Sequence, residues 1–364
     1  MNIFNRFYDR KTMTLVRPFV YKNSFVGSEA KKIIVLLLIQ VFFLLYSSSY
    51  DSVFVILSAV CASVAANLVS VHFFEDKFHN HYSWYLSIVQ GLIVGFLLPS
   101  GYPVISVFSI TLCTMLTIKH FFGGFSYAWV NPSVFAVVIL WIVGARAFPE
   151  IAISNDLLLM RNPSLQLLET GYFKIYSFDQ AVTESFNNSV FNLFGVTIPE
   201  GYISLFWDSG SAIPAFRFSF LTLVSSIILF SDDYIKLIIP SLFLVVYGTL
   251  VRFLTPVFFG GIFASGDILL ALLSGGTLFT AVFVLNWYGT APVSIAGKAF
   301  YGIIAGVFAF FISGCGTSAC GMVFTVLLSN IVSILIQQWE NHRNRLKLKK
   351  LWLWLMMKEV QNDF

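Results

Sequence analysis

The side chains that could carry chemistry are few in this sequence, and they stand next to long apolar stretches. Asp267 begins one such stretch, where an ionisable group is a candidate for an ion path. A helix N-cap is an equally good interpretation of this aspartate. His79 and His81 flank one asparagine, but metal binding needs more ligands than their neighbourhood offers. We therefore expect a solvated histidine pair and no metal site.

Two cysteines, Cys315 and Cys320, lie in a run of small residues near the end of the chain. Packing between helices and a disulfide are both open interpretations of this run. No phosphate-binding loop, dinucleotide fingerprint or hydrolase triad appears in the sequence. The motifs that identify common soluble enzymes are therefore missing, and no catalytic residue can be named.

Adjacent glycines follow a helix-breaking signal in two places, after residues 99–103 and after residues 256–261. In membrane helices such glycines allow close packing or kinks, and they also occur in broken helices around a midplane site. Their repetition beside prolines favours the second interpretation. The residues concerned are Gly123 and Gly124 in the first place, and Ser274, Gly275, Gly276 and Thr277 in the second.

The composition shows which kind of structure must position these residues. Of the 364 residues, 57% are hydrophobic and 11% are charged, against about 25% charged in an ordinary soluble domain. A transmembrane helix needs about 20 apolar residues, and the longest charge-free gaps, from Lys77 to Lys119 and from Lys298 to Glu340, each accommodate two. We therefore expect an all-α polytopic membrane protein with about ten spans.

The predicted spans form two halves of five, residues 33–147 and 216–338, joined by an outward-facing loop, 148–215. A basic segment, 1–32, precedes them, and a basic amphipathic tail, 339–364, follows. Because Lys and Arg concentrate at the termini and in the loops of one side, both termini are placed on the cytoplasmic side of a cytoplasmic-type membrane. An odd number of spans per half means that repeated halves would be inverted.

Three stretches in the second half are harder to assign. Two predicted spans, 216–231 and 235–252, have short apolar cores, which basic residues at their ends make tolerable by reaching the headgroups. The uncharged stretch 253–266 is too short to cross comfortably, so a re-entrant or interfacial segment and a plain loop both stay open. The basic tail fits contact with anionic lipid rather than nucleic acid.

Three runs in the sequence resemble one flavoprotein family. The run 122–133, which ends in an asparagine-proline pair at Asn131, resembles the family's first signature, 273–283 its second, and 321–330 its last span. The family, called NqrB/RnfD, comprises the RnfD protein of the Rnf electron-transport complex and the NqrB protein of the Na⁺-translocating NADH:quinone reductase. The resemblance covers residues 30–345, and the long outer loop and basic C-terminus agree with it.

The sequence departs from this family in two places. In the family, a threonine at the end of the outer loop carries FMN through a phosphoester bond; here Ile213 stands at that position, so we expect covalent FMN to be absent. Ser209 and Ser211 stay open as acceptors in a shifted register. The family's asp-pro pair after the eighth span is also missing, because Trp287 replaces the acid. Any role of that acid in ion passage or cofactor contact is therefore in question.

The resemblance implies a membrane subunit of an Rnf-like or Na⁺-translocating reductase-like complex, which moves electrons through flavin and couples them to Na⁺ or H⁺ translocation. Its partners would be the other subunits, so it would not be a complete enzyme alone. A non-covalent riboflavin or FMN is implied near Asn131 and the turn from Ser274 to Thr277, where a helix break frees backbone donors. Two alternatives stay open: a small-solute transporter or channel on the same scaffold, and a scaffold subunit without cofactor.

Overall fold

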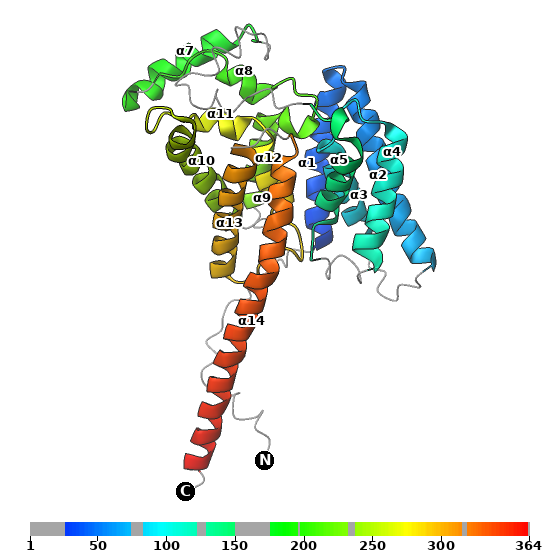
Figure 1. Ribbon diagram of the computed structural model, residues 1–364, viewed down its shortest axis with the longest axis vertical. Coiled ribbons are helices and arrows are strands. Elements are labelled where there is room, and N and C mark those ends of the chain that lie inside the picture. The colour runs from blue at the N-terminus through cyan, green and yellow to red at the C-terminus, as the bar shows by residue number, and fades with distance from the viewer. Residues whose placement is uncertain are drawn as a thin grey trace, which may run out of the picture.

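All regular secondary structure in the described part of the protein is helical. Within it no strand occurs, which confirms the predicted all-α class. Figure 1 shows two helical bundles side by side, a layer of short helices across one end, and one long helix that projects from the other end. The computed structural model describes residues 26–73, 83–121, 129–149, 175–195, 197–231, 237–314 and 319–362.

The first bundle packs through glycines of one central helix. A Cβ atom on Gly91 would lie 2.5 Å from the Cα of Val60, and one on Gly95 would lie 2.5 Å from the Cα of Ile56. The two helices therefore approach to a distance that only glycine permits. The helices of this bundle are α1 (Val26–Tyr46), α2 (Tyr50–Phe73), α3 (Ser83–Phe96), α4 (Val104–Thr114) with its π-helical end η2 (Met115–Phe121), and α5 (Pro132–Gly144) with η3 (Ala145–Ala147).

The second bundle uses glycine in the same way. On α13, a Cβ atom at Gly302 would meet the carbonyl oxygen of Ile239 at 2.9 Å, and one at Gly306 would meet Val246 at 2.8 Å. The helices of this bundle are α9 (Ser219–Ser231), α10 (Ile238–Phe259), α11 (Ile268–Leu273), α12 (Thr277–Phe279) with the π-helical η7 (Thr280–Val284), α13 (Ile295–Ala309) with the π-helical η8 (Phe310–Gly314), and α14 (Gly321–Asn362).

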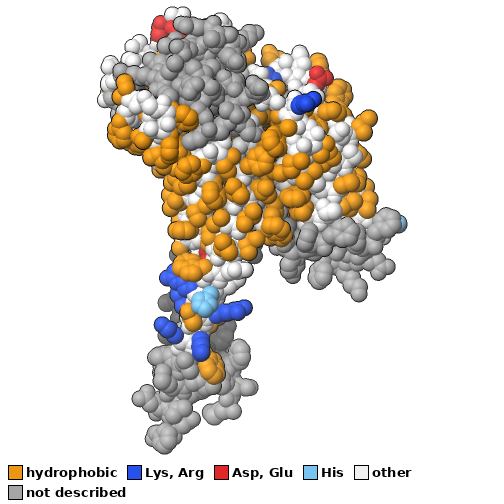
Figure 2. Space-filling view, in the orientation of Figure 1, with side chains coloured by type: hydrophobic (Ala, Val, Ile, Leu, Met, Phe, Trp, Pro, Cys, Tyr) orange, Lys and Arg blue, Asp and Glu red, His pale blue; other side chains and the backbone are white. Residues whose placement is uncertain are grey.

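Several helices suit a membrane by length and composition. Four are long and apolar enough to cross it, Tyr50–His72, Ile238–Phe259, Ile295–Gly314 and Gly321–Lys350, and shorter apolar helices accompany them. Hydrophobic side chains cover the flank of both bundles in Figure 2. The large hydrophobic side chains that are exposed include Phe42 and Ile105. An exposed apolar belt of this kind is stable in lipid and not in water. The chain is a multi-pass membrane protein.

The end of α10 differs from the prediction. The stretch 253–266, which we expected to be a re-entrant segment or a loop, is helical as far as Phe259, and only the remainder is irregular. Pro256 lacks the N–H that would bond to the carbonyl of Arg252, and the backbone N–H of Gly266 donates to that carbonyl at 3.4 Å instead. The returning chain thus replaces the missing bond, and Gly260 ends the helix with φ of 79°.

A layer of short helices from the predicted outer loop lies over one end of the second bundle (Figure 1). It contains α7 (Asp179–Ser189), η5 (Phe191–Phe194), α8 (Tyr202–Trp207) and η6 (Pro214–Phe216). The buried carboxylate of Asp179 holds α7 to α8, accepting bonds from the backbone N–H groups of Gly201 at 2.9 Å and Ser204 at 2.6 Å. Hydroxyls of Thr183 and Ser204 also donate to it. Burial raises the pKa of Asp179, but these four bonds outweigh it and leave the pKa below its usual value.

The last helix continues beyond the bundles. The predicted boundary between span and tail at residue 339 does not interrupt α14, which runs on to Asn362. Figures 1 and 2 show this extension projecting from the bundle, with Lys and Arg side chains along it. Residues 341–350 are all exposed. The basic tail is therefore a helical extension of the last predicted span.

Candidate functional site

The family's flavin-attachment motif lies in a closed loop in this chain. At its two ends, the guanidinium of Arg217 makes a bidentate ion pair with Asp208, with distances of 2.8 Å from Nε to Oδ1 and 2.6 Å from Nη2 to Oδ2. The backbone N–H of Ser209 also donates to the carbonyl of Arg217 at 3.1 Å. Both charged side chains are largely buried. A bidentate pair of this kind fixes the loop ends in one geometry.

The closed loop is attached to the first bundle at two points. Arg217 donates through Nη1 to the hydroxyl of Ser49 in the turn between α1 and α2, at 2.5 Å. The backbone N–H of Ser100 donates to the carbonyl of Ala212 at 2.9 Å. Ser100 lies in the predicted helix break at 99–103, which the structure confirms between α3 and α4. Two features that the sequence singled out separately are therefore in direct contact.

The acceptor position of the motif is buried. Ile213 has no exposed surface and is part of the apolar core. The hydroxyl of Ser209 is also buried and donates to the carbonyl of Phe216 at 2.8 Å, while that of Ser211 accepts a bond from the backbone N–H of Ile213 at 3.2 Å. The hydroxyls of both alternative acceptors therefore already have partners within the loop.

The second glycine pair packs against this same loop. Gly275 and Gly276 have φ values of 67° and 69°, a conformation that side chains other than glycine rarely adopt. A Cβ atom on Gly276 would lie 2.5 Å from the ring of Phe216, whereas one on Gly275 would meet nothing within 4 Å. The loop and the turn between α11 and α12 are therefore neighbours, as a shared site requires.

Hydroxyl groups stabilise this turn internally. Ser274 donates to the carbonyl of Leu270 at 2.6 Å, and Thr277 donates to that of Ala271 at 3.0 Å. Both hydroxyls therefore bond to the backbone of α11. Of the predicted contact residues in the turn, Gly275 alone faces open space in the described structure.

Asn131 joins the two bundles. Its side-chain oxygen caps α5 by accepting from the N–H of Ser133 at 3.0 Å, and its Nδ2 donates to the carbonyl of Val284 at 3.3 Å. Val284 ends η7, whereas Thr277 begins α12 at the opposite end of the same helical segment. Asn131 and the glycine turn therefore contact the two ends of one short helix, about 11 Å apart at 1.5 Å per residue. The predicted contacts Gly123 and Gly124 lie outside the described residues.

The described contacts offer a flavin little to bind. The amide of Asn131 and the hydroxyls of Ser274 and Thr277 already bond to protein groups. An isoalloxazine ring needs donors for its carbonyls. The two hydroxyls have no donor to spare, and the buried amide of Asn131 keeps one N–H. In the described part of the site, the fit to a flavin is therefore limited to this N–H and to an approach over Gly275.

Asp267 is a helix cap in this structure. Its side chain accepts from the backbone N–H of Leu270 at 3.0 Å, and the hydroxyl of Tyr202 in α8 donates to it. This confirms the N-cap interpretation and also ties α11 to the outer layer. A role of Asp267 in an ion path stays a prediction.

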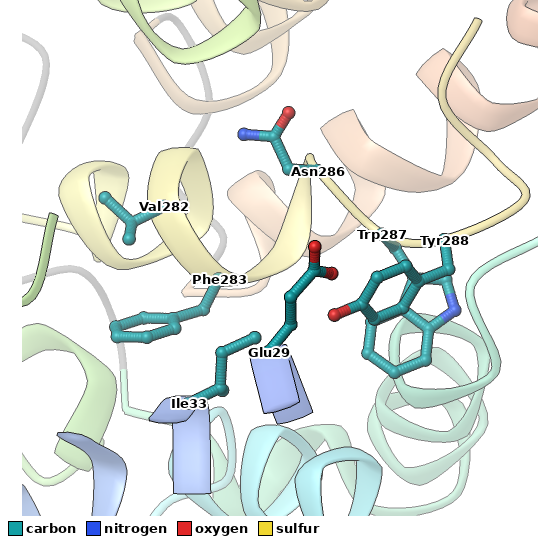
Figure 3. Close-up of a pocket in the computed structure, with 7 residues that line it drawn as sticks. All are labelled: Glu29, Ile33, Val282, Phe283, Asn286, Trp287 and Tyr288. Carbon is teal, nitrogen blue, oxygen red and sulfur yellow. The ribbon is translucent and has the colours of Figure 1, made fainter. Parts of the chain in front are cut away.

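Glu29 is a buried acid that the sequence alone did not single out. Glu29, in the first turn of α1, lines a small cavity of about 20 Å³ together with Asn286, Trp287 and Tyr288 (Figure 3). In the sequence it looked like part of the basic segment, because lysines follow it closely. The replacement of the family's acid by Trp287 was the signal that could have led to it, because it prompts a search for another acid nearby. Across the described ranges, no group of three or more His, Cys, Asp and Glu residues could hold a metal.

The chain is similar to known proteins over most of its length. The chain is 25% identical to the RnfD subunit of the ion-translocating oxidoreductase complex of Haemophilus influenzae (strain PittEE) over 317 residues, which is 78% of this chain and 84% of that protein. It is 27% identical to the corresponding subunit from Actinobacillus succinogenes, over 80% of this chain and 86% of the other. The NQR2, RnfD, RnfE family matches residues 13–345, and the chain belongs to this family.

Proposed function

We propose that this chain is a membrane subunit of an ion-translocating oxidoreductase complex of the Rnf type, and that the other subunits of such a complex are its partners. One observation carries the proposal: the family's motif regions, far apart in sequence, meet in space. The contacts of Ala212 with Ser100, of Phe216 with Gly276, and of Asn131 with Val284 join the outer loop and both bundles. The named relatives match over most of their length, which supports a whole subunit of this kind.

We further propose ten membrane crossings in two inverted halves, with both termini in the cytoplasm. Each half has a long helix, α2 or α10, followed by a shorter or broken one, α3 or α11 to η7. A helix with a π-helical end then follows, α4 with η2 or α13 with η8, and α5 or α14 comes last. This shared order supports a repeat, and the odd number of crossings would make it inverted.

We also propose that this subunit carries no covalent FMN. The acceptor position is an isoleucine in the apolar core, and the nearby serine hydroxyls bond within the loop. Electron transfer through this subunit would then depend on a non-covalent flavin, for which Gly275 offers the open approach. The ion moved would be Na⁺ or H⁺.

A second candidate, a small-solute transporter on the same scaffold, is favoured by the two departures at Ile213 and Trp287. Affinity purification of the tagged full-length chain from its native membrane separates the two candidates. Co-purifying redox subunits, identified by mass spectrometry, and flavin extracted from the native sample are expected for the oxidoreductase. A chain that purifies without either contradicts it.

The denaturing gel from the same sample tests the attachment site. We expect no fluorescent protein band under ultraviolet light, because a non-covalent flavin leaves the chain on denaturation. A fluorescent band would contradict the assignment of Ile213, and peptide mapping would then identify the serine that carries the flavin.

A further inference from the structure

The cavity beside Glu29 is lined by groups that lie far apart in the sequence. The Glu29 carboxylate comes from the first turn of α1, and the opposite wall comes from the end of η7 and the residues that follow it. Figure 3 shows the carboxylate pointing towards Asn286, with the hydroxyl of Tyr288 beside it. The Tyr288 hydroxyl hydrogen-bonds Glu29. The cavity thus lies at the junction of the two bundles.

Glu29 is less well compensated than the other buried acids of the described residues. Asp208 has an ion pair with Arg217, and Asp179 accepts four hydrogen bonds. Asp267 and Glu340 each bond a hydroxyl and a backbone N–H group.

The carboxylate of Glu29, by contrast, bonds the one hydroxyl of Tyr288 and has no ion-pair partner in the described ranges. The ammonium of nearby Lys31 lies over the ring of Tyr85 instead, 4.8 Å from its centre. Only 7% of Glu29 is exposed. Burying a carboxylate with so little compensation is costly unless a cation accompanies it.

The cavity has the size and polarity for one small ion. Its volume of about 20 Å³ accommodates one water-sized particle. The side-chain N–H groups of Asn286 and Trp287 are buried without hydrogen-bond partners in the described structure. As donors they need an acceptor oxygen, which the Glu29 carboxylate or a water molecule bound to an ion can supply. The negative charge of the Glu29 carboxylate favours a positively charged occupant.

We propose that the Glu29 cavity binds one water-sized monovalent cation, Na⁺ or hydronium, with the carboxylate as its anionic partner and Tyr288 as a second oxygen ligand. Divalent ions demand more oxygen ligands and more charge than one carboxylate provides. Trp287 stands where the family has an acid. Glu29 of α1 would then supply the missing carboxylate, because it lies beside Trp287 in the folded chain. A role of this cation as the ion that a redox complex moves rests on the proposed function. The binding of the cation to Glu29 does not rest on it.

Thermal unfolding of the full-length chain in lipid nanodiscs tests the proposal. NaCl replaces choline chloride at constant ionic strength, because a ligand that binds the folded state raises its melting temperature. We expect a saturable rise of about 2–4 °C in the wild-type chain. Glu29→Gln keeps the shape of the side chain but removes its charge, and should abolish this rise. Glu184→Gln removes an exposed acid of α7 and should leave it unchanged.

A pH series without Na⁺ distinguishes the two cations. Among the residues that line the cavity, Tyr288 is the one other titratable side chain, and it stays neutral over the range from pH 5 to 8. On α1, the charged side chains nearest to Glu29 in sequence are Lys31 and Lys32. A melting temperature that rises as pH falls in wild type, but not in Glu29→Gln, identifies the cation as a proton.

Two results would overturn the proposal. One is a Na⁺ response of equal size in wild type and Glu29→Gln. The other is the absence of any difference between these two chains in either titration. If Glu29→Gln fails to fold, Glu29→Asp keeps the charge but draws it back by one methylene, and a Na⁺ affinity within about twofold of wild type would contradict a direct contact. Failure to co-purify redox subunits would leave these results unaffected.

Discussion

The side-chain amide of Asn131 donates to the carbonyl of Val284, 153 positions further along the chain, and caps α5 at the same time. One buried side chain thus stabilises a helix start in the first bundle and binds the end of η7 in the second. Because Val284 ends the helical segment that the glycine turn begins, this bond also limits how far that turn can move relative to α5. The two roles can be separated by substitution.

We expect Asn131→Ser to keep the cap and lose the bond to Val284, because a hydroxyl can accept from the N–H of Ser133 but is too short to cross to η7. Asn131→Ala should lose both. The loss in free energy of unfolding should be about 1 kcal/mol for serine and about 2 kcal/mol for alanine. Thermal unfolding in nanodiscs measures both variants, and equal losses would contradict a separate contribution from the contact between bundles.

The two turn glycines form a matched pair for testing the contact with the flavin-motif loop. Gly275→Ala and Gly276→Ala impose similar backbone strain, about 1–2 kcal/mol, because both have φ near 70°. Only Gly276→Ala also pushes a methyl group into the ring of Phe216. We therefore expect Gly276→Ala to lower the melting temperature more. In a chain that also carries Phe216→Ala, the two glycine substitutions should cost the same. An excess cost of Gly276→Ala that persists in that chain would exclude this contact as its cause.

Most of the helical layout could be predicted from the sequence, because it depends on local composition. The break at 99–103 follows from proline and glycine, and the predicted helices around it are present. For residues 253–259 the plain loop was the wrong alternative, because proline usually ends a helix and Pro256 does not. Here the N–H that replaces the missing donor comes from Gly266, ten residues further on and folded back, which no local pattern reveals.

The site was predictable in part for the same reason. Motifs identified the loop at Ile213, the turn at Gly275 and the cap at Asn131, but not which of them touch. Asp208 lies in the outer loop, whereas Arg217 stands at the end of the predicted span 216–231. From the sequence Arg217 was therefore expected to reach the lipid headgroups and not to pair with Asp208. Glu29 was missed because its partner Tyr288 lies far away in the sequence, and burial arises only from tertiary packing.

The ion pair that closes the motif loop should be sensitive to geometry as well as charge. Arg217→Lys keeps the charge but cannot make two parallel bonds to Asp208 and still reach Ser49. Removing one partner, as in Asp208→Asn, leaves a buried guanidinium and should cost about 3 kcal/mol. We expect Arg217→Lys to lie between wild type and Asp208→Asn in melting temperature.

A double-mutant cycle checks this assignment. Asp208→Asn combined with Arg217→Gln should be more stable than the sum of the single losses indicates, because neither charge is then left alone. Additive losses would show that the two side chains stabilise the loop independently.

Acid stability should report on Asp179, which holds the outer layer together. Its pKa in the folded protein lies below the usual value. Its ionised form therefore stabilises the fold fully above pH 4, and this contribution is lost as pH falls through the lowered pKa.

Asp179→Asn should be less stable than wild type at pH 7 by about 1–3 kcal/mol, because an amide cannot accept all four bonds. The difference should shrink as pH falls below 4 and be smallest below the lowered pKa, where the wild-type carboxylate is itself protonated. Melting temperatures between pH 3 and 7 measure this, with Glu184→Gln as the exposed control, and a difference that stays constant across the range would mean that charge on Asp179 does not stabilise the layer.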